Sequence, residues 1–250
     1  MALPLDEPLI PELRPSSAAA IGELWHLRAA SELRVGAQFR RLAFEFRTRS
    51  LAPELGAHLE QAALDEARHS EICTAVGNRY AACAAPEGPV EAPPLVRFGD
   101  ADERSSLLLH LVLLSCINEG VSTFYLRDAM KHSRSTLAHE ALRQLLSDDV
   151  QHARIGWMHL ASPAVSSADK RLVSAALPTL LGLSRSAWTN VPPRAEVWFV
   201  EHGCPGVAVA EQAFHDAVRE LVLPGMAHVG VDTAPAARWL ASLGTAKREP

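Results

Sequence analysis

The sequence lacks the features that mark several large classes of protein. Its 24 Lys and Arg residues and 29 Asp and Glu residues are mixed along the chain, so no basic face is expected that would bind nucleic-acid phosphates. The first 15 residues carry acids and prolines where a signal peptide has a basic and then an apolar segment. No apolar run reaches membrane length by inspection. We therefore expect a cytoplasmic protein with neither a nucleic-acid nor a membrane partner.

Cysteines and aromatic residues are also scarce. Cys73, Cys83, Cys116 and Cys204 show no paired spacing, which excludes a Cys-x-x-Cys metal site and a disulfide framework and predicts reduced thiols. Aromatic residues make up 6% of the chain, whereas hydrophobic residues make up 48% with few β-branched runs, and this balance favours an all-α protein. At 250 residues the chain is long enough to bury a large core.

The sequence does contain two copies of one short pattern. They are Asp65-Glu66-Ala67-Arg68-His69 and Asp148-Asp149-Val150-Gln151-His152. In each, a carboxylate and an imidazole stand three residues apart, so on a helix both leave the same face. With this composition roughly one or two such matches arise by chance. A third match, Glu23 with His26, is therefore expected to be coincidental. Whether the other two copies form a common site depends on how their helices pair.

The first copy lies in a predicted helical hairpin. Residues from about 17 to 49 are rich in Ala, Leu, Arg and Glu without an internal Pro, which predicts a long helix. Residues 50–53 break it, and Pro53 suits the first turn of a second helix that runs to about residue 79. In an antiparallel pair, residues equidistant from the turn lie at the same level. The partner of Glu66 and His69 should therefore lie near residues 32 to 36, and Glu32 is there.

The second copy repeats this construction. A helix is predicted from about residue 102 to 131, a turn at 132–135 and a fourth helix from about 136 to 160. Glu119 lies level with Asp149 and His152, within an almost wholly apolar run. An ionised carboxylate there is costly unless it is paired or bound to a cation. Glu32 is less informative, because Arg28 at i−4 offers the alternative of a solvated ion pair.

Together these residues resemble the ferritin-like di-iron carboxylate superfamily over about residues 17 to 160. Its oxygen-activating members include multicomponent monooxygenase hydroxylases, acyl-carrier-protein desaturases, ribonucleotide reductase small subunits and arylamine N-oxygenases. The resemblance implies a four-helix bundle that holds two iron ions. It assigns one iron to Glu32, Glu66 and His69, and the other to Glu119, Asp149 and His152, with Glu66 and either Asp149 or Glu119 as bridges.

The resemblance extends to residues that support the ligands. It implies that Asp65 and Asp148 accept hydrogen bonds from the histidines, and that Arg68 matches an arginine that often precedes the first histidine. Thr123, one turn after Glu119, matches a pocket threonine of some monooxygenases and is the candidate catalytic residue. Small residues on the metal-facing sides of the first and third helices could line a pocket, although tight packing explains them equally well: Ala29, Val35, Gly36, Ser115, Cys116 and Gly120.

Two departures from the family pattern bear on chemistry. Asp149 replaces the usual Glu, and its shorter side chain limits bridging and leaves scope for an open coordination position. Leu145 stands where arylamine N-oxygenases carry an extra histidine, which disfavours that activity. Four carboxylates and two imidazoles suit Fe/Fe, with Mn/Fe as the alternative, whereas zinc would favour thiolates.

The remaining segments set the predicted organisation. Residues 17–161 form the metal-binding bundle, with a long crossover at 82–94. Residues 162–250 form a C-terminal helical extension packed on it, with helices near 166–183, 205–221 and 234–243. This extension could instead form a homodimer surface.

The predicted function is an oxidase or oxygenase that activates dioxygen to oxidise a small organic substrate, with an external electron donor where the reaction needs one. The alternatives are a ferroxidase or iron-handling protein and a metal-free helical interaction protein.

Overall fold

The computed structural model describes residues 3–4, 6–49, 51–81, 95, 98–190 and 197–246. In these residues all regular structure is helical. The elements are η1 (Ile10–Glu12), α1 (Pro15–Thr48), α2 (Pro53–Tyr80), α3 (Glu103–Leu111), η2 (Val112–Glu119), α4 (Gly120–His132), α5 (Thr136–Ala161), α6 (Ser167–Thr189), α7 (Val197–Glu201), α8 (Val207–Ala217), η3 (Val218–Val222), α9 (Leu223–His228) and α10 (Ala234–Ala246). The protein is all-α, as the sequence predicts.

The first hairpin is formed by α1 and α2. The chain leaves α1 after Thr48 and reverses through Ala52, whose φ of 42° places it in the left-handed region. Pro53 then begins α2, where its missing N–H costs no intrahelical hydrogen bond. Ser50, in the predicted turn, lies outside the described residues.

The second hairpin is formed by α3, η2 and α4, which run on as one rod, and by α5. The middle segment, η2, is π-helical and ends at Glu119. Ser135 caps α5, because its Oγ accepts a hydrogen bond of 3.0 Å from the N–H of Ala138. All four long helices therefore form at the predicted places, with ends that differ by at most two residues.

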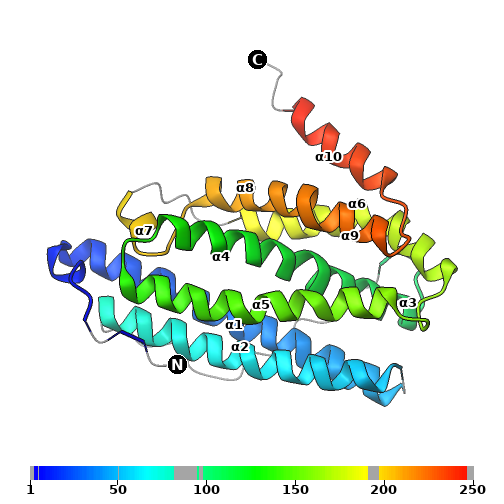
Figure 1. Ribbon diagram of the computed structural model, residues 1–250, viewed down its shortest axis with the longest axis horizontal. Coiled ribbons are helices and arrows are strands. Elements are labelled where there is room, and N and C mark those ends of the chain that lie inside the picture. The colour runs from blue at the N-terminus through cyan, green and yellow to red at the C-terminus, as the bar shows by residue number, and fades with distance from the viewer. Residues whose placement is uncertain are drawn as a thin grey trace.

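The two hairpins lie side by side in one bundle (Figure 1). α2 finishes at the end of the bundle where α1 begins, whereas α3 starts at the opposite end. The predicted crossover at 82–94 lies outside the described residues. Because α2 finishes at one end of the bundle and α3 starts at the other, a long connection between them is required.

The helices α6, α8 and η3 lie along the rod formed by α3, η2 and α4 (Figure 1), and α10 packs against α6. These C-terminal helices differ from the prediction in extent. α6 continues to Thr189 rather than 183, and α7 was not predicted. The helix expected to end near residue 221 continues through η3 and α9 to His228 despite Pro224. The π-helical turn of η3 precedes this proline and changes the hydrogen-bonding register, so the missing N–H of Pro224 does not end the helix.

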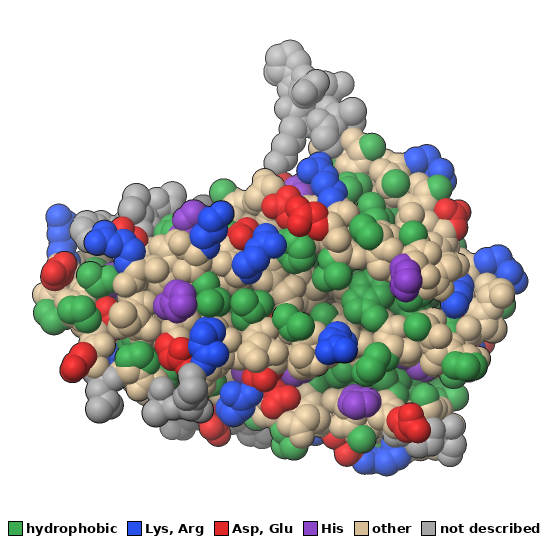
Figure 2. Space-filling model, in the orientation of Figure 1, with side chains coloured by type: hydrophobic (Ala, Val, Ile, Leu, Met, Phe, Trp, Pro, Cys, Tyr) green, Lys and Arg blue, Asp and Glu red, His purple; other side chains and the backbone are tan. Residues whose placement is uncertain are grey.

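One hydrophobic core joins the bundle to these helices. Cys116 and Ile117 of η2 pack with Leu181 of α6, Phe214 of α8 and Val222 of η3, all fully buried. The helical extension therefore shares a core with the bundle. On the face shown in Figure 2, Lys, Arg, Asp and Glu side chains are intermixed over the described surface.

The third rod of the bundle corrects one sequence-level expectation. Among the described residues, the helix Glu103–His132 is long and apolar enough to span a membrane, with a mean hydropathy of 1.6. Inspection missed it because Glu119 interrupts the apolar run near its middle. In the structure 67% of this apolar window is buried inside the protein. Packing within the bundle therefore accounts for its composition.

Candidate metal centre

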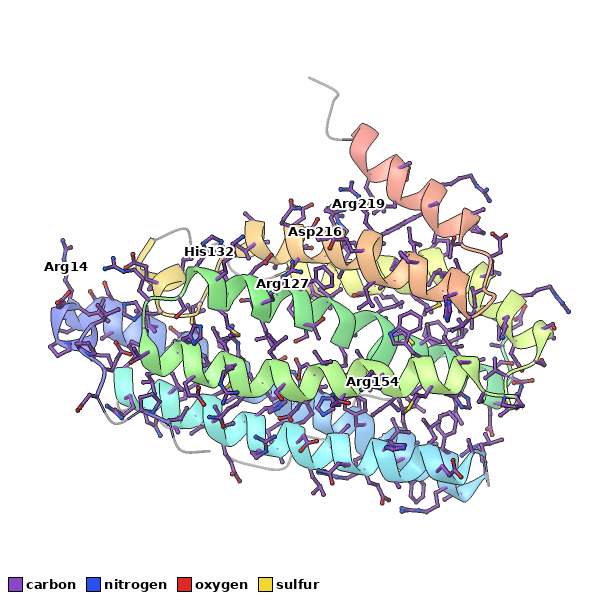
Figure 3. All side chains as sticks on the ribbon, viewed as in Figure 1. Arg14, Arg127, His132, Arg154, Asp216 and Arg219 are labelled. Carbon is purple, nitrogen blue, oxygen red and sulfur yellow. The ribbon has the colours of Figure 1, made fainter. Side chains whose placement is uncertain are left out.

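Six side chains from the four rods of the bundle converge at mid-height. Glu32 comes from α1, Glu66 and His69 from α2, Glu119 from the end of η2, and Asp149 and His152 from α5. Ligand atoms of Glu66, Glu119, Asp149 and His152 lie within 4.8 Å of one another, and so do those of Glu32, Glu66 and His69. Glu32 is partly buried, whereas the other five are buried. Arg127 and Arg154, on the outer faces of α4 and α5, are exposed (Figure 3).

Glu66 is the member shared by both groups. Its Oε1 lies 3.0 Å from Nδ1 of His152, and its Oε2 lies 3.3 Å from Nδ1 of His69. Gly36 of α1 allows this placement, because a Cβ at position 36 would lie 2.9 Å from the Cβ of Glu66. Glu66 therefore lies between the two histidines, where one carboxylate can serve two ions.

The two imidazoles point their Nδ1 atoms into the cluster and their Nε2 atoms outward. Nε2 of His69 lies 3.0 Å from Oδ2 of Asp148, and Nε2 of His152 lies 3.4 Å from Oδ2 of Asp65. Arg68 forms an ion pair with Asp148 and lies 3.6 Å from Asp65. Each aspartate thus faces the histidine of the other helix. Sequence predicted these aspartate–histidine contacts, but their crossing depends on how α2 packs against α5.

The cluster carries more negative charge than its imidazoles can offset. Burial, together with the charges of Glu66 and Asp149, raises the pKa of Glu32 well above its usual value, and burial and the same neighbours raise that of Glu119. Burial and Glu66 raise the pKa of Asp149 to about 6. Glu66 behaves differently: burial opposes its ionisation, but the two imidazoles outweigh this and lower its pKa to about 2.

The histidines respond to the same charges. Burial disfavours an imidazolium at His69, but Asp148 and Glu66 outweigh it and raise the pKa to about 11. The pKa of His152 is also raised against burial, by Glu66 and Asp149. A bound cation would favour the ionised form of the carboxylates and the neutral form of the imidazoles, because its charge attracts the carboxylates directly.

The donor set fits two divalent ions. Nδ1 of His152 is buried and, although close to Glu66, makes no hydrogen bond among the described residues, as expected of a nitrogen that serves as a ligand. Four carboxylates offset the charge of two divalent cations. Oxygen and imidazole donors suit iron and manganese. The groups of Glu32, Glu66 and His69 and of Glu66, Glu119, Asp149 and His152 supply a place for each ion.

A hydroxyl that sequence reasoning missed also reaches the cluster. Ser122 Oγ donates a hydrogen bond of 2.6 Å to Oδ2 of Asp149. The hydroxyl of Thr123, the predicted catalytic residue, instead donates to the carbonyl of Gly120 at 2.7 Å. The available signal was spacing, since Ser122 follows Glu119 by three residues and so shares its helix face.

The predicted pocket residues lie within the packed interior. Ala29, Gly36, Cys116 and Gly120 are buried, and only Val35 is partly exposed. Ser115, also buried, makes a specific contact: its Oγ donates to the carbonyl of His152 and accepts a hydrogen bond of 2.8 Å from the N–H of Gly156. The burial of this set fits both expectations, close helix packing and a pocket lining, and Ser115 also joins two helices.

His26, from the third pattern match, and Arg28, the alternative partner of Glu32, make contacts outside the cluster. Nε2 of His26, in the third pattern match, lies 3.0 Å from Oδ1 of Asn78, outside the cluster. Arg28 does not form the ion pair with Glu32 that the sequence offered as an alternative. Its Nη2 donates instead to the hydroxyl of Tyr125 at 3.3 Å and to the carbonyl of Gly203 at 3.2 Å.

No family model and no curated protein matches this sequence. Among solved structures, the chain is similar to "Protein 19 with aldehyde deformylating oxidase activity from Synechococcus". The similarity has a TM-score of 0.58 at 17% sequence identity, and it covers 92% of this chain and 100% of that chain. This chain has the ferritin-like fold. The likeness at this identity concerns the fold, and the carboxylate–histidine cluster of this fold could bind metal.

Proposed function

We propose that this protein is a di-iron oxidase or oxygenase that uses dioxygen to oxidise a small organic substrate. The observation that carries the proposal is the convergence of four carboxylates and two Nδ1 atoms from four helices on one buried centre. The fold shared with a protein of aldehyde deformylating oxidase activity supports the same class of chemistry.

In this proposal Glu32, Glu66 and His69 hold one ion and Glu66, Glu119, Asp149 and His152 the other. A bound iron pair would supply the electrons and coordination positions for activating dioxygen. Mn/Fe remains the alternative pair, because the donor set suits both metals.

The protein's own part is to present and orient these groups. Asp65 and Asp148 hold the outer nitrogens of the histidines, which fixes Nδ1 as the inward-facing atom and makes it a stronger donor. Burial of the cluster excludes bulk water from five of the six ligands. Thr123, one turn beyond Glu119, stays a candidate catalytic residue in the substrate pocket.

Metal loading and oxygen consumption test the proposal together. The purified chain would be loaded anaerobically with Fe(II), assayed for bound iron, and then mixed with oxygenated buffer in the presence of aldehydes, carboxylic acids or amines. We expect about two iron ions per chain, and substrate-dependent oxygen uptake with an oxidised organic product. Glu119→Gln should lose iron and uptake together, whereas Glu103→Gln, an exposed carboxylate on the same rod, should lose neither.

The same measurement separates the alternatives. A ferroxidase would take up oxygen in proportion to added Fe(II), with no organic product and no effect of substrate. A metal-free interaction protein would bind no iron specifically, and Glu119→Gln would leave its metal content unchanged. Either result would overturn the oxygenase proposal.

A further inference from the structure

Arg28 is a partly buried cation close to the candidate metal centre. It precedes Glu32 by one helical turn of α1, and its guanidinium lies 4.6 Å from the ring centroid of Trp25 and 5.6 Å from that of Tyr125. Its Nη2 donates to Tyr125 and to the carbonyl of Gly203. These contacts hold the planar group in one orientation but contribute no negative charge.

The guanidinium has unused binding capacity. Its Nη1 is buried and makes no hydrogen bond in the part of the chain that the structure describes. No carboxylate of that part forms an ion pair with Arg28, although other arginines such as Arg104 and Arg185 have one. Removing part of a charged group from water without an ion-pair partner costs free energy, and a bound anion would offset that cost.

The metal centre does not supply the missing counterion when it is loaded. The four carboxylates Glu32, Glu66, Glu119 and Asp149 carry four negative charges, and two divalent cations neutralise them. Arg28 then remains as the uncompensated charge beside a neutral cluster. An anion bound at Arg28 would complete the balance.

The least buried ligand of the cluster, Glu32, lies on the same helix as Arg28. Glu66, Glu119 and Asp149 are at most 5% exposed, whereas Glu32 is only partly buried. Arg28, one turn before Glu32 on α1, is also only partly buried. The same is true of Tyr125 on α4, which contacts Arg28. A small molecule that approaches the cluster beside Glu32 therefore passes the guanidinium.

We propose that Arg28 binds the carboxylate of the substrate, so that the protein acts on a small organic acid whose other end lies beside Glu32. The inference rests on the proposed function and narrows its substrate class. One helical turn rises about 5.4 Å, so the acid is about the size of benzoate or hexanoate rather than a long-chain lipid. A planar guanidinium held at Nη2 with Nη1 free is suited to a carboxylate.

Calorimetric titration tests this with benzoate and hexanoate and with their neutral counterparts, benzamide and hexanamide. Wild type, Arg28→Gln and Arg28→Lys would each be titrated metal-free and loaded with Co(II), at constant ionic strength. We expect both acids to bind wild type at least about tenfold more tightly than the amides. Arg28→Gln should weaken acid binding by about tenfold or more and leave amide binding little changed, with Arg28→Lys between the two.

A matched control is Arg185→Gln. Arg185 is also half-buried, with a buried Nε that makes no hydrogen bond among the described residues, but it is paired with Glu211. Its loss should not affect acid binding. Circular dichroism and Co(II) stoichiometry would establish that each variant folds, and Arg28→Lys carries the test if Arg28→Gln does not.

Three results would overturn the inference: equal acid affinity for wild type and Arg28→Gln, equal affinity for acid and amide, or no acid binding to wild type. Acid that binds only the Co(II) form and survives Arg28→Gln would be coordinated by the metal, which also overturns it. Failure of the proposed function would look different. Wild type would then bind no Co(II) pair, while the metal-free titrations would still report on Arg28.

Discussion

The hydroxyl of Ser122 donates a 2.6 Å hydrogen bond to Oδ2 of Asp149, while Oδ1 of the same carboxylate lies 3.7 Å from Nδ1 of His69 and 3.8 Å from Nδ1 of His152. One oxygen of Asp149 is therefore occupied by α4, and the other faces the cluster. The short aspartate side chain and this tether together limit Asp149 to one oxygen for a metal. Glu66 is left as the carboxylate best placed to bridge.

Removal of the Ser122 hydroxyl should weaken the metal site without unfolding the protein. Such supporting contacts are worth about 10- to 100-fold in metal affinity, so we expect Ser122→Ala to lose about that much affinity for one Co(II) ion and to alter its visible absorption spectrum. Ser122→Thr should restore both. Ser174→Ala, which removes a 2.7 Å hydrogen bond to the carbonyl of Asp232 far from the cluster, should leave the spectrum unchanged. An unaltered Ser122→Ala spectrum would show that the contact does not orient Asp149.

Substitution of the shared carboxylate should affect both ions. Glu66→Gln removes a ligand common to the two groups, so we expect Co(II) stoichiometry to fall to less than one per chain. Glu32→Gln belongs to one group and should retain about one ion. Glu60→Gln, in which an exposed carboxylate of α2 loses its ion pair with Arg47, is the control and should bind as wild type does. Equal losses in Glu66→Gln and Glu32→Gln would contradict the bridging role.

Glu7 should make the stability of the protein depend on acid pH. Its Oε2 accepts hydrogen bonds from the hydroxyl of Ser135 at 2.7 Å and from the N–H of Leu137 at 2.9 Å, at the N-terminus of α5. Burial opposes ionisation of Glu7, but these hydrogen bonds outweigh it and lower its pKa below the usual 4.5. The unfolded chain therefore binds this proton more tightly. The stabilisation is complete above about pH 4.5 and is lost as the pH falls through the lowered pKa.

Urea denaturation of Glu7→Gln tests this linkage. We expect the substitution to cost about 1–3 kcal/mol at pH 7, because charge-assisted hydrogen bonds to a buried carboxylate are lost, and the difference from wild type to shrink below pH 4.5. Glu12→Gln, which changes an exposed carboxylate five residues further along the chain, should be neutral at every pH. A difference that does not vary with pH would exclude the charge of Glu7 as its cause.

Gly156 should resist even the smallest side chain. A Cβ there would lie 2.5 Å from Sγ of Cys116 and 3.1 Å from Cβ of Ser115, on the rod that carries Glu119. We expect Gly156→Ala to cost about 1–3 kcal/mol in the free energy of unfolding, despite the better helix propensity of alanine. The double variant Gly156→Ala with Cys116→Ala should recover part of this loss, because the clashing sulfur is gone. Gly182→Ala, where the nearest atom is 3.7 Å away, should be neutral or stabilising.

Much of the bundle could be predicted from the chain itself. The four long helices, the turns near Pro53 and Ser135, and the level of Glu32 with Glu66 and of Glu119 with Asp149 follow from local rules: helix propensity, proline placement and the rise per residue. The helix end that was predicted wrongly also has a physical explanation. The helix containing Pro224 continued because the π-helical turn before it depends on packing that no local pattern reveals.

The sequence by itself determined which side chains share a helix face and which helices pair, because both depend on spacing along the chain. Only the tertiary structure decided the contacts between hairpins. The crossing of Asp65 and Asp148 to the opposite histidines, the tether from Ser122 to Asp149 and the unpaired guanidinium of Arg28 all depend on how one rod is rotated against another. That rotation is set by the packing of residues distant in sequence, such as Gly36 against Glu66 and Gly156 against Cys116.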